Sequence, residues 1–127
     1  MPGPRPIRVL ILDDEVQIRR ILADFLEDEG RFEVRDVGTT AEALSALDAR
    51  RADVCLVDLR LRGTDGFAFV TEASTRHPSV RFLIHTGSEE SGVRERARAA
   101  GIPEERILLK PLPLEEIARA LDEAAGA

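Results

Sequence analysis

Short apolar segments rich in β-branched residues alternate with helix-forming segments along the whole chain, and this alternation restricts the fold more than any other feature. Each apolar segment has the length and composition of a buried strand, and each is followed by residues with helical spacing or propensity. Strict alternation of this kind predicts a parallel sheet covered by helices on both faces and joined by right-handed crossovers. We therefore predict a doubly wound α/β fold of five strands and five helices. The predicted strands are residues 7–12, 32–37, 52–57, 80–85 and 106–109.

Local signals mark the predicted helices. Thr39 and Glu42 have the spacing of a capping box, and Gly30 can end the helix before it. Residues 89–100 have few large apolar side chains, so we expect that helix to be weakly anchored and mobile. The helix before Gly30 is predicted from apolar residues with amphipathic spacing, namely Ile18, Ile21, Leu22, Phe25 and Leu26.

Length and composition suit one domain. At 127 residues we expect a flexible lead-in at 1–6, a folded domain at 7–123 and a short tail at 124–127. No apolar run approaches the roughly 20 residues of a membrane helix, and the start lacks an apolar signal core, so we expect a soluble, cytoplasmic protein without membrane insertion. The single cysteine, Cys55, excludes an internal disulfide. A net charge of -6 disfavours direct nucleic-acid binding.

Polar residues stand directly after four of the five predicted strands. They are Asp13 and Asp14 after the first strand, Asp58 after the third, Thr86 after the fourth and Lys110 after the fifth. In a parallel sheet these positions gather at one edge. The second strand ends without a charged group, as an edge strand would, which suits the flavodoxin-like order 2-1-3-4-5. In that order the first and third strands are neighbours, and a crevice opens between them.

Three carboxylates at one edge predict a cation site. Without a cation they repel one another, and a hard divalent ion with oxygen ligands offsets that repulsion. Mg²⁺ is the natural candidate, and it commonly completes its shell with phosphate oxygen. A carboxylate can attack phosphorus and form an aspartyl phosphate, while Lys110 and Thr86 offset the charge on the phosphoryl oxygens.

Each of these residues also has an ordinary structural interpretation. The pair Asp13-Asp14 taken alone is more often a helix cap than a metal site, and Thr86 alone is a common strand-end hydroxyl. Lys110 is the single lysine among 18 basic residues, the rest being arginine, which favours a need for a compact point charge there. Cys55, His77 and His85 are interpreted as structural, with a low prior that His85 reaches the site.

The combination resembles the receiver domains of two-component response regulators over residues 7–123. The resemblance implies that a sensor histidine kinase, a phosphotransfer protein or a small phosphodonor transfers a phosphoryl group to Asp58 in the presence of Mg²⁺. It also implies that Asp14 binds the metal directly, that Asp13 binds it through water, and that the Arg60 carbonyl is a third protein ligand. Thr86 and Lys110 would bind phosphoryl oxygens. The matching positions are Asp13, Asp14, Val57-Asp58-Leu59-Arg60-Leu61, Gly63-Thr64-Asp65-Gly66, Thr86-Gly87 and Lys110-Pro111.

Some positions depart from the family pattern. Ile107 stands where the family usually has an aromatic residue that rotates inward on activation, and Phe82 is the only aromatic residue near it. Residues 101–105 lengthen the connection before the fifth strand, and Arg62 replaces a frequent proline. Arg60 and Ser88 occupy positions where family members tune the lifetime of the phosphorylated state.

The leading hypothesis is a stand-alone receiver of the chemotaxis-regulator type, whose phosphorylation alters a face that binds a downstream protein. Such a protein is a phosphoacceptor regulator rather than an enzyme acting on a separate substrate. Two alternatives are a Mg²⁺-dependent phosphohydrolase that turns over through an aspartyl phosphate, and a degenerate receiver that binds partners without phosphorylation. The sequence leaves open a phosphorylation-dependent dimer and an origin as part of a longer regulator.

Overall fold

Strands and helices alternate along the chain in the computed structural model, which describes residues 5–58, 66–86, 93–110 and 112–126. A short 3-10 turn, η1, spans Glu104–Arg106 before the last strand. No helix of these described segments is both long enough and apolar enough to cross a membrane. The strands are β1 (Ile7–Leu12), β2 (Phe32–Val37), β3 (Val54–Asp58), β4 (Arg81–Thr86) and β5 (Ile107–Leu109). The helices are α1 (Val16–Asp28), α2 (Thr40–Ala49), α3 (Gly66–Arg76), α4 (Val93–Ala99) and α5 (Leu114–Gly126).

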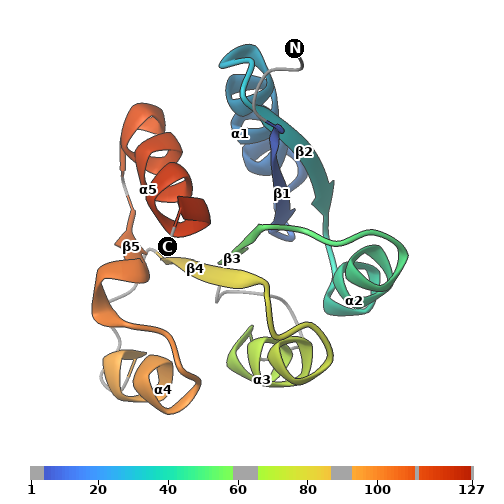
Figure 1. Ribbon diagram of the computed structural model, residues 1–127. Coiled ribbons are helices and arrows are strands. Elements are labelled where there is room, and N and C mark those ends of the chain that lie inside the picture. Colours follow the sequence, from blue (N-terminus) through green and yellow to red (C-terminus); the bar gives the residue numbers. More distant parts are fainter. Residues whose placement is uncertain (1–4, 59–65, 87–92, 111, 127) are drawn as a thin grey trace.

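The five strands form one sheet in the order β2-β1-β3-β4-β5, and every neighbouring pair is parallel. The predicted fold class and strand order are therefore confirmed. β2 lies at the edge, as its uncharged end indicated, and β1 pairs with β3 in the centre (Figure 1). Leu12 pairs with Val57, so the residues that follow β1 lie beside Asp58 at the end of β3.

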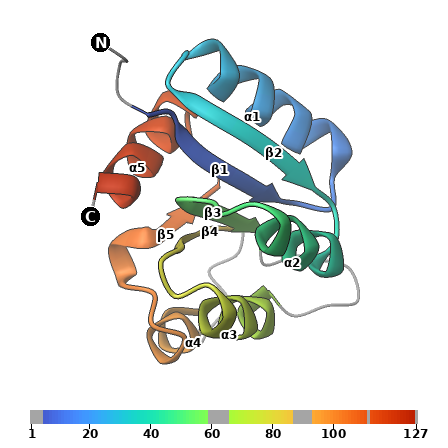
Figure 2. The same ribbon diagram turned by 45° about the vertical axis from the view of Figure 1, so that its right-hand side comes forward.

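Helices cover both faces of the sheet. Figures 1 and 2 show α1 and α5 on one face, and α2, α3 and α4 on the other. Side chains alternate across each strand, so Leu10 and Leu12 pack toward α2 and α3, while Val9 and Ile11 pack toward α1 and α5. All five residues of β3 are buried. This buried central strand holds Asp58 in a fixed position at the end of the sheet where the parallel strands terminate.

Two of the local helix signals have the predicted structure. The Thr39 hydroxyl oxygen accepts a hydrogen bond from the Glu42 backbone N–H at 3.1 Å, which caps α2. Gly30 has φ of 81°, the left-handed conformation that glycine adopts most easily after a helix. The last strand begins at Ile107 instead of the predicted residue 106, because Arg106 belongs to the 3-10 turn that occupies part of the longer connection. Residues 89–92 of the predicted fourth helix lie outside the described segments.

The apolar face of α1 is only partly buried, which the periodicity did not predict. Leu22 and Leu26 are buried, whereas Ile18 is 38% exposed and Ile21 is 61% exposed. The second half of the helix packs against the sheet, but its first turns stand beside a pocket that separates them from α5. Apolar spacing predicts which side of a helix faces the protein, but not how closely the neighbouring helix approaches.

Candidate functional site

Three carboxylates meet where β1 and β3 end. Asp13 and Asp14 follow β1, and Asp58 is the last residue of β3. Each contributes an oxygen, and these oxygens lie within 4.8 Å of one another. Asp13 and Asp58 are each only 3% exposed, whereas Asp14 is half-buried. The hard oxygen atoms of these carboxylates are the kind of ligand that Mg²⁺ prefers.

Lys110 is the cation beside the acidic cluster. Its Nζ lies 3.2 Å from Asp58 Oδ2, and its side chain is 23% exposed. Its backbone N–H donates a hydrogen bond to the Thr86 carbonyl oxygen at 2.8 Å, which ties the chain after β5 to the end of β4. The single lysine of the chain therefore contacts the predicted phosphoacceptor directly.

Burial makes the charged form of Asp13 unfavourable. Desolvation raises the pKa of this carboxyl, a hydrogen bond from the Glu15 backbone N–H opposes the rise, and the negative charge of Asp58 adds to it. The positive charge of Lys110 lowers the same pKa, but by less than burial, the Glu15 N–H or Asp58 changes it. Within the described residues, the ammonium of Lys110 offsets only part of the charge of three carboxylates, so this part of the site fits a divalent cation.

Several contacts hold Asp13 in place. The Glu15 N–H donates to Asp13 Oδ1 at 2.8 Å, and the Asp13 N–H donates to the Val37 carbonyl at 3.1 Å. Arg19 donates from Nη1 to the Asp13 carbonyl at 3.1 Å and forms an ion pair with Asp36 at 2.9 Å through Nε. Arg19 thereby connects the end of β1 with the end of β2 and positions the acidic pair. Sequence reasoning missed this role.

The guanidinium of Arg19 needs space beside β2. A Cβ atom at Gly38 would lie 2.8 Å from Arg19 Nη1, so the missing side chain at Gly38 leaves the room that Nη1 occupies. Gly38, the uncharged residue that follows β2, therefore also supports the acidic site.

Thr86 ends β4 next to Asp58 and is 1% exposed. The residue before it, His85, pairs with Asp58 in the sheet register. His85 is 7% exposed, and burial, followed by the charge of Lys110, lowers its pKa to about 4. This burial is consistent with the structural interpretation of His85, and the sheet register also places the residue beside the acidic cluster. His77, by contrast, pairs with Asp48 at 2.8 Å on the surface.

Ile107 is half-buried and pairs with Ile84. Phe82 is buried in the hydrophobic layer against which Ile107 packs, and its ring meets that of Phe69 edge to face, with ring centroids 6.3 Å apart. Several predicted positions lie outside the described residues, among them the Arg60 carbonyl: Leu59, Arg60, Leu61, Arg62, Gly63, Thr64, Asp65, Gly87, Ser88 and Pro111.

The fold and the site together define a doubly wound α/β domain with three carboxylates and a lysine where its parallel strands end. The family model described as the response regulator receiver domain matches residues 9–122. The chain therefore belongs to the response regulator receiver domain family, and the resemblance inferred from the motifs is confirmed.

Individual relatives agree with this membership. The chain is 29% identical over 121 residues to the transcriptional regulatory protein PdtaR of Mycobacterium tuberculosis, covering 95% of this chain and 58% of PdtaR. It is similar to the receiver domain of the putative response regulator NarL from the same species, with a TM-score of 0.88, 26% identity, and coverage of 98% and 99% of the two chains. The chain thus spans little more than half the length of PdtaR.

A third relative carries a modified aspartate. It is a response regulator protein from Burkholderia pseudomallei, solved with a phosphorylated aspartic acid, a calcium ion and citrate. The TM-score is 0.83 at 28% identity, and the match covers 94% of this chain and 69% of that chain.

Proposed function

We propose that this chain relays a signal by accepting a phosphoryl group on Asp58. The observation that carries the proposal is the contact of Lys110 Nζ with Asp58 Oδ2 at 3.2 Å, beside two further carboxylates at the same sheet edge. The phosphorylated aspartic acid of the Burkholderia pseudomallei relative supports the same chemistry. Membership of the receiver family supports a sensor histidine kinase or a phosphotransfer protein as the phosphodonor, and a downstream protein as the target.

In the proposed reaction a carboxylate oxygen of Asp58 attacks phosphorus. The new O–P bond forms as the P–N bond of a donor phosphohistidine breaks, and the imidazole leaves with the electron pair of that bond. The Lys110 ammonium and the Thr86 hydroxyl donate hydrogen bonds to phosphoryl oxygens. These hydrogen bonds offset the negative charge on the oxygens. Asp13, Asp14, Asp58 and the Arg60 carbonyl would hold Mg²⁺. When bound, this ion neutralises negative charge on the carboxylates and on the transferred group.

Phosphorylation acts as a switch in this proposal. It shifts an existing equilibrium between two conformations, which changes the surface that a downstream protein binds. A cytoplasmic location and a role as a regulator, with no separate substrate, belong to the same proposal. A dimer that forms on phosphorylation is compatible with it.

Intact-mass spectrometry tests the central step. After incubation with acetyl phosphate and Mg²⁺, the protein should gain the mass of one phosphate, and chelation of the metal should prevent the gain. Absence of any gain would favour the degenerate receiver that binds partners without phosphorylation. Multiple turnover on phosphate monoesters would favour the phosphohydrolase instead.

Asp13→Asn should stabilise the metal-free protein and remove its response to Mg²⁺. The folded state raises the pKa of Asp13, so its ionisation costs stability once the pH exceeds the unfolded value of 3.8. The asparagine oxygen can still accept from the Glu15 N–H. We expect a gain on the order of 1 kcal/mol at pH 7 that vanishes below pH 3.8, where the aspartate is protonated in both states.

Urea unfolding with and without Mg²⁺ measures both effects. At a metal concentration ten times Kd the wild type should gain about 1.4 kcal/mol, while Asp13→Asn should gain little. Asp24→Asn is the matched control, because Asp24 is exposed on α1. If Asp13→Asn responded to Mg²⁺ as strongly as the wild type, Asp13 would not belong to the metal site.

A further inference from the structure

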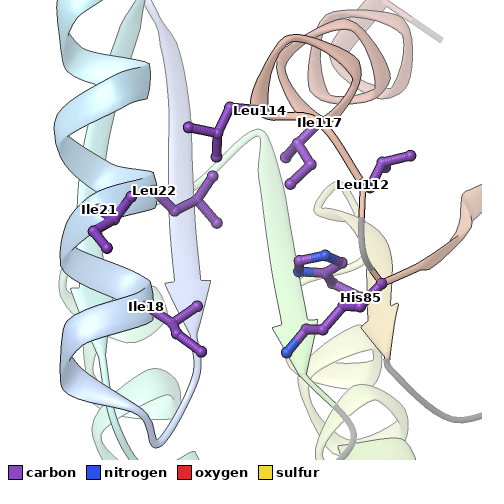
Figure 3. Close-up of a pocket in the computed structure, with 8 residues that line it drawn as sticks. Ile18, Ile21, Leu22, His85, Leu112, Leu114 and Ile117 are labelled. Atoms are coloured by element: carbon purple, nitrogen blue, oxygen red, sulfur yellow. The ribbon is translucent and has the colours of Figure 1, made fainter.

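A pocket of about 310 Å³ lies between α1 and α5, on the face of the sheet away from α2, α3 and α4. It is lined by Ile18, Ile21, Leu22, His85, Lys110, Leu112, Leu114 and Ile117. Figure 3 shows Ile18 and Leu22 of α1 pointing toward the space below α5, with the His85 ring below Ile117. Its volume and its few polar groups match small-molecule sites, which begin at about 300 Å³.

His85 is the polar group of this pocket that lacks a partner. The residue is 93% buried, and within the described part of the chain its Nε2 atom has no hydrogen-bond partner. A buried polar atom without a partner costs free energy that a bound group can recover. A neutral imidazole has one donor and one acceptor nitrogen, so Nε2 can form a hydrogen bond with a bound hydroxyl group in either direction.

We propose that this pocket binds a small uncharged molecule with an apolar body and one hydroxyl group, of the alkylphenol class, whose hydroxyl hydrogen-bonds His85. The apolar body would fill the space between Leu22 and Ile117. A hydroxyl can both donate and accept, so it suits either tautomer of the neutral ring. An anionic head is disfavoured, because the ammonium of Lys110 is already paired with Asp58.

The pocket has an exposed mouth through which a small molecule can enter. Ile18 and Ile21 line the pocket and yet remain 38% and 61% exposed, so a molecule can reach the interior without unfolding α1. A water molecule could satisfy His85, but it would leave the apolar walls unfilled. Lys110 belongs both to this pocket and to the acidic site, so an occupant would contact the residue that pairs with Asp58.

Titration with para-propylphenol and with propylbenzene, followed by ¹⁵N and methyl NMR of the intact protein, tests the proposal. We expect the phenol to shift the methyl resonances of Ile18, Leu22 and Ile117, and to bind about fivefold more tightly than the hydrocarbon. His85→Leu should remove this preference while retaining hydrocarbon binding. If neither compound shifts the methyl resonances of the lining residues, the proposal is overturned, and the pocket is a water-filled groove or a docking surface for another protein.

A matched pair of variants locates the site. Ile21→Asp places a charge at the pocket mouth and should weaken phenol binding at least tenfold. Val16→Asp adds the same charge at a residue of α1 that is 55% exposed and does not line the pocket, so binding should persist. Equal losses in both variants would contradict the assignment. Asp58→Asn should still bind the phenol, which separates this inference from the proposed phosphorylation.

Discussion

Asp58→Asn should gain no phosphate under conditions in which acetyl phosphate and Mg²⁺ phosphorylate the wild type. An amide oxygen is a far weaker nucleophile than a carboxylate, so the bond to phosphorus does not form. The substitution hardly changes the size of the side chain, and its oxygen can still accept a hydrogen bond from Lys110, which lies 3.2 Å from Asp58 Oδ2. Removing one of three adjacent negative charges also relieves repulsion. The fold should therefore persist while phosphorylation is lost.

Intact mass and thermal unfolding of both proteins provide the measurement and its control. The variant should unfold at a temperature no lower than that of the metal-free wild type. Because Asp13 and Asp14 lie in the same cluster, each is an alternative acceptor. A full phosphate gain in Asp58→Asn, located by peptide mapping on either neighbour, would show that the acceptor had been assigned to the wrong carboxylate.

The fold and most of the acidic site could be predicted because both depend on local sequence and on one rule of topology. Apolar runs define the strands, and parallel strands bring the residues after them to one edge. Asp13, Asp14, Asp58 and Lys110 are therefore close in space although the sequence separates them. The chemical types of these residues alone predicted that the site binds a cation and a phosphoryl group.

Other features depend on how the elements pack together, which the periodicity of apolar residues does not predict. The spacing of Ile18 and Ile21 placed them on the inner face of α1, but the distance to α5 leaves both partly exposed beside the pocket. No motif in the sequence marks Arg19, yet its side chain connects Asp13 with Asp36. His85 lies between Ile84 and Thr86 in β4, and its place in the sequence did not indicate that it lines the pocket between α1 and α5.

Lys110→Met should slow phosphorylation of Asp58 by acetyl phosphate about a hundredfold, the usual effect of removing one fixed charge or donor from a transferring group. The methionine retains an apolar stem of similar length, so the wall that Lys110 adds to the pocket remains. Mg²⁺ binding should not weaken, because the lost ammonium repels the ion and competes for Asp58. The initial rate of mass gain and the Mg²⁺-dependent shift in unfolding together separate a chemical role of Lys110 from a structural one.

Lys110→Arg tests why this chain, with arginine at every other basic position, has a lysine here. Arginine keeps the charge, but its guanidinium is broad, planar and fixed in its donor geometry, whereas an ammonium is compact. The space beside Asp58 is shared with Asp13, which is almost fully buried. We therefore expect Lys110→Arg to retain less than a tenth of the wild-type rate of phosphorylation by acetyl phosphate. Full activity in this variant would mean that positive charge alone is required, and the single lysine would then have no chemical explanation.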